Sequence, residues 1–202
     1  LVKGASKGEG LGNKFLSHIR EVDAIIHLVR CFDSDKITHV NSKINPVDDL
    51  ETIKTEIILA DIDVIEKKFD KSKKKLLDDK EIKILEEKLE QLNQGSEIKT
   101  NDEKENKFLS SLGLLSLKPK IIVCNVDEEN LSKGNSYTES VKNKHPNKKV
   151  VTICADIEDQ ITDLNNNERE IFMKEIGLNK TGLNQLIKEG YDLLNLDTFF
   201  TS

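Results

Sequence analysis

The chain has 202 residues, of which 34% are charged, 36% are hydrophobic and only 4% are aromatic, and its net charge is −6. The negative charge excludes an overall basic surface for nucleic acid, while a local basic patch stays open. No apolar run is long enough to cross a bilayer and no signal peptide is visible, so we expect a cytoplasmic protein without a membrane partner.

The chain begins with a glycine-rich segment, residues 1–13, which contains Gly4, Gly8, Gly10 and Gly12. Glycines at this density predict a mobile loop, because they permit conformations that other residues avoid. One interpretation is a plain linker. The other is a phosphate-binding loop, because a helical apolar stripe follows directly and leads into a strand. That stripe consists of Phe15, Leu16, Ile19 and Val22.

Three short, β-branched runs predict buried strands at 24–32, 121–124 and 150–155. Helical patterns lie between them, which favours crossover connections and therefore a parallel sheet of the α/β class. Polar residues follow each run. Ligands bind beyond the carboxyl ends of such strands, so we expect a binding edge there. Cys31, Cys124 and Cys154 lie at or near these ends, and without metal-ligand spacing they are better read as core residues than as metal or disulfide positions.

A helical hairpin is predicted between the first two strands. Asn45-Pro46 begins a helix of about thirty residues, and Leu77-Asp78-Asp79 offers a new N-cap for a second helix that runs to Gly95. The two should fold back as an antiparallel hairpin. Lysines crowd its distal end, either as a solvated helix face or as a contact to phosphate backbone. They are Lys67, Lys68, Lys71, Lys73, Lys74 and Lys75.

The remaining segments alternate polar connectors and short helices. Residues 96–107 read as a charged connector and 108–115 as a short apolar helix. Further helices are expected at 137–144, at 168–176 and after Thr181, which is a suitable N-cap.

Four stretches together resemble a known family. The opening L-V-K-G-A-S-K-G-E-G-L-G-N-K-F-L resembles the switch region of Obg-type P-loop GTPases. The match narrows to the YchF group, the Obg-like ATPases, with K-I-N-P-V-D-D-L-E-T-I at 43–53, N-V-D-E at 125–128 and L-N-L-D-T-F-F-T at 194–201. The resemblance covers essentially the whole chain.

The resemblance implies a partial P-loop G domain with an inserted antiparallel coiled-coil hairpin. Residues 1–45 and 101–202 would belong to the G domain and 46–100 to the hairpin. It also implies a monomeric, ribosome-associated nucleotide hydrolase that uses Mg²⁺ and prefers ATP to GTP. The P-loop, the Asp-x-x-Gly motif and the TGS domain of the family do not occur in this sequence. We therefore expect the missing segments to be either cut off or disordered, the Mg²⁺ ligands to lie outside this chain and this piece alone to be inactive.

The base-recognition motif departs from the guanine-specific Asn-Lys-x-Asp pattern. Val126 replaces the lysine and Glu128 the aspartate, while Asn125 is kept. A carboxylate placed for guanine does not suit adenine, whereas an amide can still pair with adenine N6 and N7. The backbone at Cys154 and Ala155 would border the base. Without the resemblance, the same residues read as an Asx-type turn after a strand.

Two positions bear on catalysis. Leu1 stands where many GTPases carry the glutamine that orients water, and leucine cannot form hydrogen bonds. His27 is the candidate replacement, and a backbone-bonded core histidine is the alternative.

Two rival functions stay open. One is a conventional Obg-type GTPase. The other is a non-catalytic module whose hairpin docks on the ribosome or its RNA through Lys73, Lys74 and Lys75.

Overall fold

The structure is a computed structural model that describes residues 11–35, 37, 43–70 and 77–200. Its contacts divide the chain into two compact units. The first comprises Leu1–Asp23 and Glu51–Lys118, and the second comprises Ala24–Leu50 and Pro119–Ser202. The division expected from the sequence, at 1–45, 46–100 and 101–202, stays a prediction.

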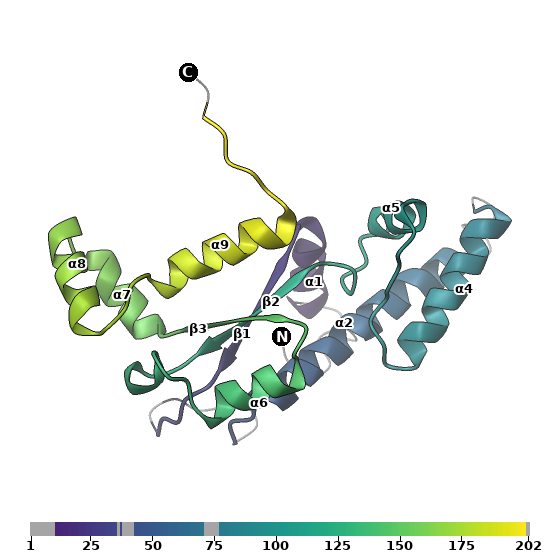
Figure 1. The fold of residues 1–202 in the computed structure, drawn as a ribbon. Coiled ribbons are helices and arrows are strands. Elements are labelled where there is room, and N and C mark those ends of the chain that lie inside the picture. The colour runs from purple at the N-terminus through teal and green to yellow at the C-terminus, as the bar shows by residue number, and fades with distance from the viewer. Residues whose placement is uncertain (1–10, 36, 38–42, 71–76, 201–202) are drawn as a thin grey trace. The chain divides into compact units, whose positions relative to one another are not determined.

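The second unit is built on a three-stranded sheet in the order β1-β2-β3 (Figure 1). The strands are β1 (Ile25–Arg30), β2 (Lys120–Asn125) and β3 (Lys149–Ile153). Both pairs are parallel, with Arg30 opposite Asn125 and Asn125 opposite Ile153. The predicted α/β class and parallel sheet are confirmed, and the carboxyl ends of all three strands therefore lie at one edge.

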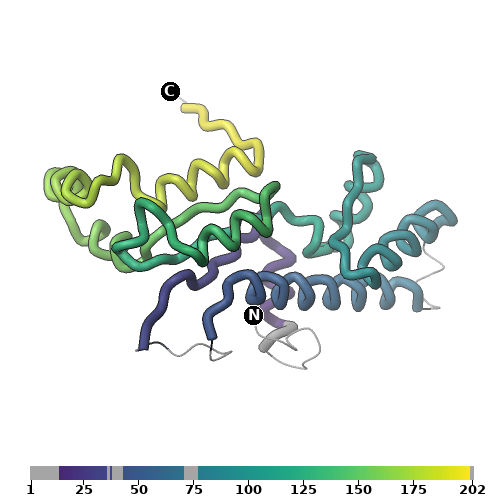
Figure 2. Tube along the Cα trace, turned by 60° about the horizontal axis from the view of Figure 1, so that its bottom comes forward, coloured from purple at the N-terminus to yellow at the C-terminus, as the bar shows by residue number. Residues whose placement is uncertain are grey.

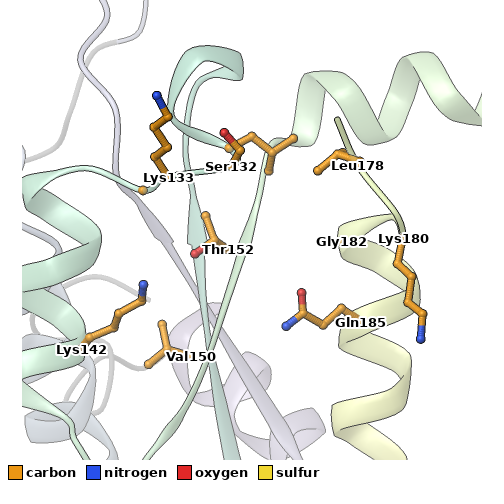
Figure 3. Close-up of a pocket in the computed structure, with 11 residues that line it drawn as sticks. Ser132, Lys133, Lys142, Val150, Thr152, Leu178, Lys180, Gly182 and Gln185 are labelled. Carbon is orange, nitrogen blue, oxygen red and sulfur yellow. The ribbon is translucent and has the colours of Figure 1, made fainter. Parts of the chain in front are cut away.

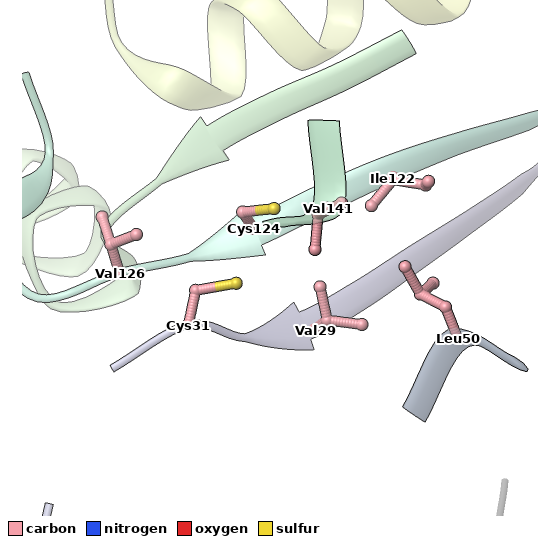
Figure 4. Packing of buried hydrophobic residues seen from close by; sticks show 7 residues of the cluster. All are labelled: Val29, Cys31, Leu50, Ile122, Cys124, Val126 and Val141. Carbon is pink, nitrogen blue, oxygen red and sulfur yellow. The ribbon is translucent and has the colours of Figure 1, made fainter. Parts of the chain in front are cut away.

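Helices cover β2 on both faces (Figure 1). Ile122 and Cys124 pack in a cluster with Val141 of α6 (Ser136–Lys144) (Figure 4). Ile121 and Val123 alternate to the opposite face, where α9 (Gly182–Leu194) packs. This two-sided cover explains why the run 121–124 is continuously apolar.

The three cysteines are free thiols in the core, as the sequence predicts. Cys31, the residue after β1, lies beside Cys124 of β2 in the same cluster (Figure 4). A hydrogen bond with Cys124, together with burial, raises the pKa of Cys31 well above its ordinary value. Cys31 therefore stays protonated and unreactive at neutral pH.

In the first unit, α2 and α4 lie side by side in opposite directions (Figures 1 and 2). The long helix α2 (Pro46–Phe69) starts in the second unit and continues through the first, and α4 spans Asp79–Asn93. Asp78 begins α4 with a capping box that includes Glu81, and Gly95 follows its end at φ +75°. The hairpin is confirmed, although α2 is shorter than expected. Coiled-coil packing between the two helices stays a prediction.

The two apolar stripes of α2 pack into separate clusters. Ile58 and Ile65 pack with Leu85 and Leu92 of α4. Ile57 joins a second cluster on the other side. Its remaining members are Leu16, Ile19, Ile53, Ala60 and Leu115. Each stripe therefore has its own partner, which explains why a long helix of a charged chain is apolar on two sides.

Three helix boundaries differ from the sequence prediction. The first helix, α1 (Leu11–Glu21), includes residues 11–13, which we predicted as loop. Helix α5 (Glu103–Ser111) starts inside the predicted charged connector, because Asp102 accepts a hydrogen bond from the Glu105 N–H and caps it. It also ends before Leu112. Charged residues at 103–107 are compatible with a solvated first turn.

Helix α7 (Ala155–Asp163) was missed altogether. It has only two buried apolar residues, Ile157 and Ile161, and its N-cap Cys154 forms no side-chain cap. The helices predicted at 137–144, 168–176 and after Thr181 are found as α6, α8 (Asn166–Glu175) and α9. A short 3₁₀ turn, η1, covers Glu128–Asn130. Across the described ranges, every helix is too short or too polar to traverse a bilayer.

Asp61, on α2, is the polar centre of the first unit. Its carboxylate is fully buried and accepts hydrogen bonds from the backbone N–H groups of Leu115 and Ser116, both at 2.8 Å. The Ser116 hydroxyl donates to it at 2.6 Å, and Arg20 lies 3.4 Å away. Arg20 also donates to the carbonyls of Gly113 and Ala60. One carboxylate therefore holds α1 and the 113–116 turn onto α2.

Replacing Asp61 with alanine should destabilise this unit by about 3–5 kcal/mol, because two buried N–H groups and the Ser116 hydroxyl lose their acceptor and the part-buried Arg20 loses its counter-ion. Urea unfolding followed by circular dichroism measures the loss, and amide exchange at Leu115 and Ser116 should accelerate. Asp63→Ala is the matched control: its ion pair with Lys67 is exposed, so it should cost less than about 1 kcal/mol. Equal urea midpoints for Asp61→Ala and Asp63→Ala would contradict the conclusion that Asp61 holds α1 and the 113–116 turn onto α2. Should Asp61→Ala not fold, Asp61→Asn, which keeps one acceptor, should give an intermediate midpoint.

Candidate functional site

The candidate site lies where the three parallel strands end. Arg30, Asn125 and Ile153 are register partners and the last residues of their strands. The hydrogen-bonded ladder continues one step further, with Cys31 N–H donating to Asn125 and Val126 N–H donating to Ile153. The loops that leave the strands therefore start from fixed positions.

Asn125 is half-buried and links the ends of two strands. Its side-chain Oδ1 accepts a hydrogen bond of 3.0 Å from the Ala155 N–H, at the start of α7 just beyond β3. This bond fixes the amide orientation, so Nδ2 is directed away from Ala155 as a donor. Within the described ranges no protein acceptor is recorded for Nδ2. The site therefore presents an oriented hydrogen-bond donor at the sheet edge.

The three residues after Asn125 differ in exposure and role. Val126 is buried in the sheet core, so its side chain packs and does not face the edge. Asp127 caps η1 by accepting a bond of 3.1 Å from the Asn130 N–H. Glu128 is exposed. Asp127 thus forms the Asx-type turn that the sequence allowed. Glu128, three residues after Asn125, is exposed to solvent in this turn.

The residues after β3 act mainly through their backbone. Cys154 is buried at the N-cap of α7, and burial raises the pKa of its thiol. Ala155 is exposed, and its N–H is used by Asn125. Ala155 therefore positions the amide of Asn125, while the expected contact of this backbone with a base stays a prediction.

Arg30 is a structural determinant of this edge that the sequence reasoning missed. Its guanidinium donates to the carbonyls of Phe32, Ser34 and Ile37 at 3.0, 3.2 and 2.8 Å, and it lies 4.8 Å from the centre of the Phe32 ring. A signal was available, because an arginine at the end of an apolar strand needs acceptors nearby if it is partly buried. These bonds fold the segment after β1 back on itself.

The start of α6 holds the same segment from the other side. The Asn135 side chain donates to the Cys31 carbonyl at 2.7 Å, and the Tyr137 hydroxyl donates to Asp33 at 2.9 Å. The hydrogen bond with Asp33 raises the pKa of Tyr137. The edge is thus bordered by a segment fixed at both sides.

Other predicted site residues are not brought to this edge. His27 lies opposite Ile122, three residues before the end of β1, which is about 10 Å along the strand. Gly12 is part of α1. Leu1, Gly4, Gly8, Gly10, Lys73, Lys74 and Lys75 lie outside the described residues.

Among the residues that the structure describes, no group of three or more His, Cys, Asp or Glu side chains is placed to hold a metal ion by itself. Mg²⁺ is usually held by one or two carboxylates together with substrate phosphates, so the expectation that its ligands lie outside this chain stays a prediction.

Comparison with known proteins gives one consistent result. The whole chain aligns with ribosome-binding ATPases named YchF: that of Bacillus subtilis (strain 168) is 43% identical over 213 residues, and that of Escherichia coli O157:H7 is 44% identical over 211. The Mycoplasma genitalium protein is 44% identical over 217 residues. The chain spans 58% of the length of each of these three relatives. No family model matches it.

A solved structure agrees with these relatives. The YchF GTPase of Schizosaccharomyces pombe superposes with a TM-score of 0.78 at 30% identity, over 93% of this chain and 54% of that one. Sequence and fold therefore lead to the same assignment: over its whole length, the chain is similar to one part of the YchF proteins.

Proposed function

We propose that the full-length protein binds a purine nucleotide at the carboxyl edge of this sheet, prefers ATP to GTP and hydrolyses its γ-phosphate. The observation that carries the proposal is the Asn125 amide, which Ala155 orients so that Nδ2 is a donor at the edge. The relatives are named ATPases in bacteria and a GTPase in fission yeast, which supports a nucleotide hydrolase and leaves the base to be tested.

The donor suits a purine base. Both adenine and guanine carry an acceptor at N7, so Nδ2 of Asn125 can bind either ring. Discrimination between adenine and guanine then depends on Glu128. An aspartate at this position accepts from guanine N1–H and N2–H, but the extra methylene of glutamate and its exposed setting move the carboxylate away. The proposal therefore predicts that the usual selectivity for guanine is lost, as a preference for ATP requires.

Hydrolysis would proceed by in-line attack of water on the γ-phosphate. Mg²⁺, when bound, would neutralise developing charge, with ligands outside the described residues. The glycine-rich segment that contains Gly4, Gly8 and Gly10 and runs on to Gly12 in α1 is proposed to order around the γ-phosphate. His27 is kept as the proposed water-positioning residue in place of Leu1. Replacing His27 with alanine tests this role, and an unchanged turnover would refute it.

Asn125→Asp should weaken ATP binding by about tenfold or more, because it keeps the acceptor for Ala155 N–H while exchanging the Nδ2 donor for a second acceptor. Titration of the full-length protein with a fluorescent ATP analogue measures the change. Asn184→Asp, on the exposed side of α9, is the matched control and should leave affinity unchanged. Wild-type affinity of the Asn125→Asp variant for ATP would show that the base does not bind at Asn125.

Glu128→Asp should shift preference toward GTP by several-fold, because it shortens the carboxylate to the length used for guanine. Competition between ATP and GTP on the full-length protein gives the ratio. Glu129→Asp, one residue on and equally exposed, is the control and should leave the ratio unchanged. A wild-type protein that already prefers GTP would favour the rival reading as a conventional GTPase.

We also propose the ribosome as partner, because the bacterial relatives are named ribosome-binding. The α2–α4 hairpin has its own apolar core and is a suitable docking arm. Changing Lys73, Lys74 and Lys75 to glutamate should abolish co-sedimentation with ribosomes at low salt and flatten its salt dependence. Lys80, Lys83 and Lys104 changed to glutamate make a charge-matched control. Undiminished binding of the first variant would exclude an electrostatic contact to ribosomal RNA through these lysines.

A further inference from the structure

The outer edge of β3 carries backbone N–H and C=O groups that pair with no neighbouring strand in the described part of the chain. In the described part of the chain, β3 pairs only with β2. The Ile153 carbonyl accepts from Val126 and so turns toward β2. Because successive residues of a parallel strand turn their N–H and C=O groups to opposite sides, those of Val150 and Thr152 turn to the outer edge.

A pocket of about 280 Å³ lies along this outer edge (Figure 3). Val150 and Thr152 line it from the strand. Lys142 of α6 and Gln185 of α9 extend toward the strand from opposite sides. The rest of the wall comes from the loop 131–134 and the segment before α9. The edge of β3 thus lies at the floor of a trough with a wall on each face of the sheet.

The trough is positively charged. Three lysines, Lys133, Lys142 and Lys180, line it, and the lining contains no aspartate or glutamate. Lys142 is held by Glu139 only at 3.4 Å on an exposed helix face. For Lys133 and Lys180, no ion pair is recorded within the described ranges. Outside the lining, the Glu158 carboxylate accepts a hydrogen bond of 2.6 Å from the N–H of Gly182, which itself lines the trough.

We propose that this trough binds an extended, acidic peptide segment of a partner protein, which adds to β3 as a further strand. Its backbone would pair with Val150 and Thr152, and its side chains would alternate between the Lys142 wall and the Gln185 wall. Acidic side chains would then meet the lysines. This site is separate from the nucleotide edge, and the proposal does not depend on the nucleotide.

The strand edge favours a peptide over a simple anion. A free phosphate accepts hydrogen bonds and would use only the lysines and the N–H groups. The carbonyls of Val150 and Thr152 need donors, which a peptide backbone supplies at the matching spacing. An acidic peptide is the ligand that satisfies both kinds of group and the charge.

The test uses the full-length protein and a labelled five-residue peptide that alternates glutamate and valine. We expect saturable binding, with amide exchange slowed at Val150 and Thr152 and unchanged at Val151, whose N–H already turns toward β2. Lys142→Glu should lower affinity about fivefold, because it reverses one exposed charge at the site. Lys144→Glu, two residues along α6 and also exposed, should leave it unchanged.

Three results would overturn the proposal. A peptide with proline at its centre cannot pair as a strand, so equal binding of that peptide would exclude strand addition. Complete competition by inorganic phosphate would indicate an anion site only. Protection of the Val150 and Thr152 amides in the free full-length protein would show that the protein covers this edge itself.

Discussion

The hydrogen bond between Ala155 N–H and Asn125 Oδ1 is the constraint on which the candidate site depends. It ties the end of β2 to the first turn of α7 and decides which half of the Asn125 amide is offered to a ligand. Parallel pairing is what makes it possible, because Asn125 and Ile153 are register partners and both strands release their chains at the same edge. An antiparallel neighbour would place the two residues at opposite ends of the sheet.

The polar residues around the sheet edge also stabilise the structure. Arg30 is occupied by three carbonyls of the segment that follows β1, and Asn135 holds the same segment through the Cys31 carbonyl. Such fully engaged polar groups leave few side chains free to act on a ligand. Asn125 is distinguished among them because one of its two polar atoms has no recorded partner in the described part of the chain. In the other unit, Asp61 plays a purely structural part, since its bonds all go to neighbouring protein groups.

Much of this architecture could be predicted from the sequence. Continuous apolar runs predicted the three parallel strands, but only β2 is buried along most of its length. The prediction of burial was wrong for β1, where Ile26 and Leu28 are exposed. Caps at Asp78 and Thr181 placed helix starts correctly. Weak patterns failed: α7 has only two buried residues, and the charged first turn of α5 resembles a connector. The role of Asn125 was predicted by its position after a strand, but its bond with Ala155 joins residues thirty positions apart and requires the register of the sheet. His27 was selected by its position in the strand after the first helix and by the family resemblance, and its catalytic role stays a prediction, although the register places it about 10 Å from the edge.

The central claim is that Nδ2 of Asn125 donates to N7 of a purine base. Comparison of ATP with 7-deaza-ATP, which lacks that single acceptor, tests it most directly in the full-length protein. The structure predicts that 7-deaza-ATP binds about three- to tenfold more weakly, and that Asn125→Ala abolishes the difference. Equal affinity of the wild-type protein for the two nucleotides would contradict the account.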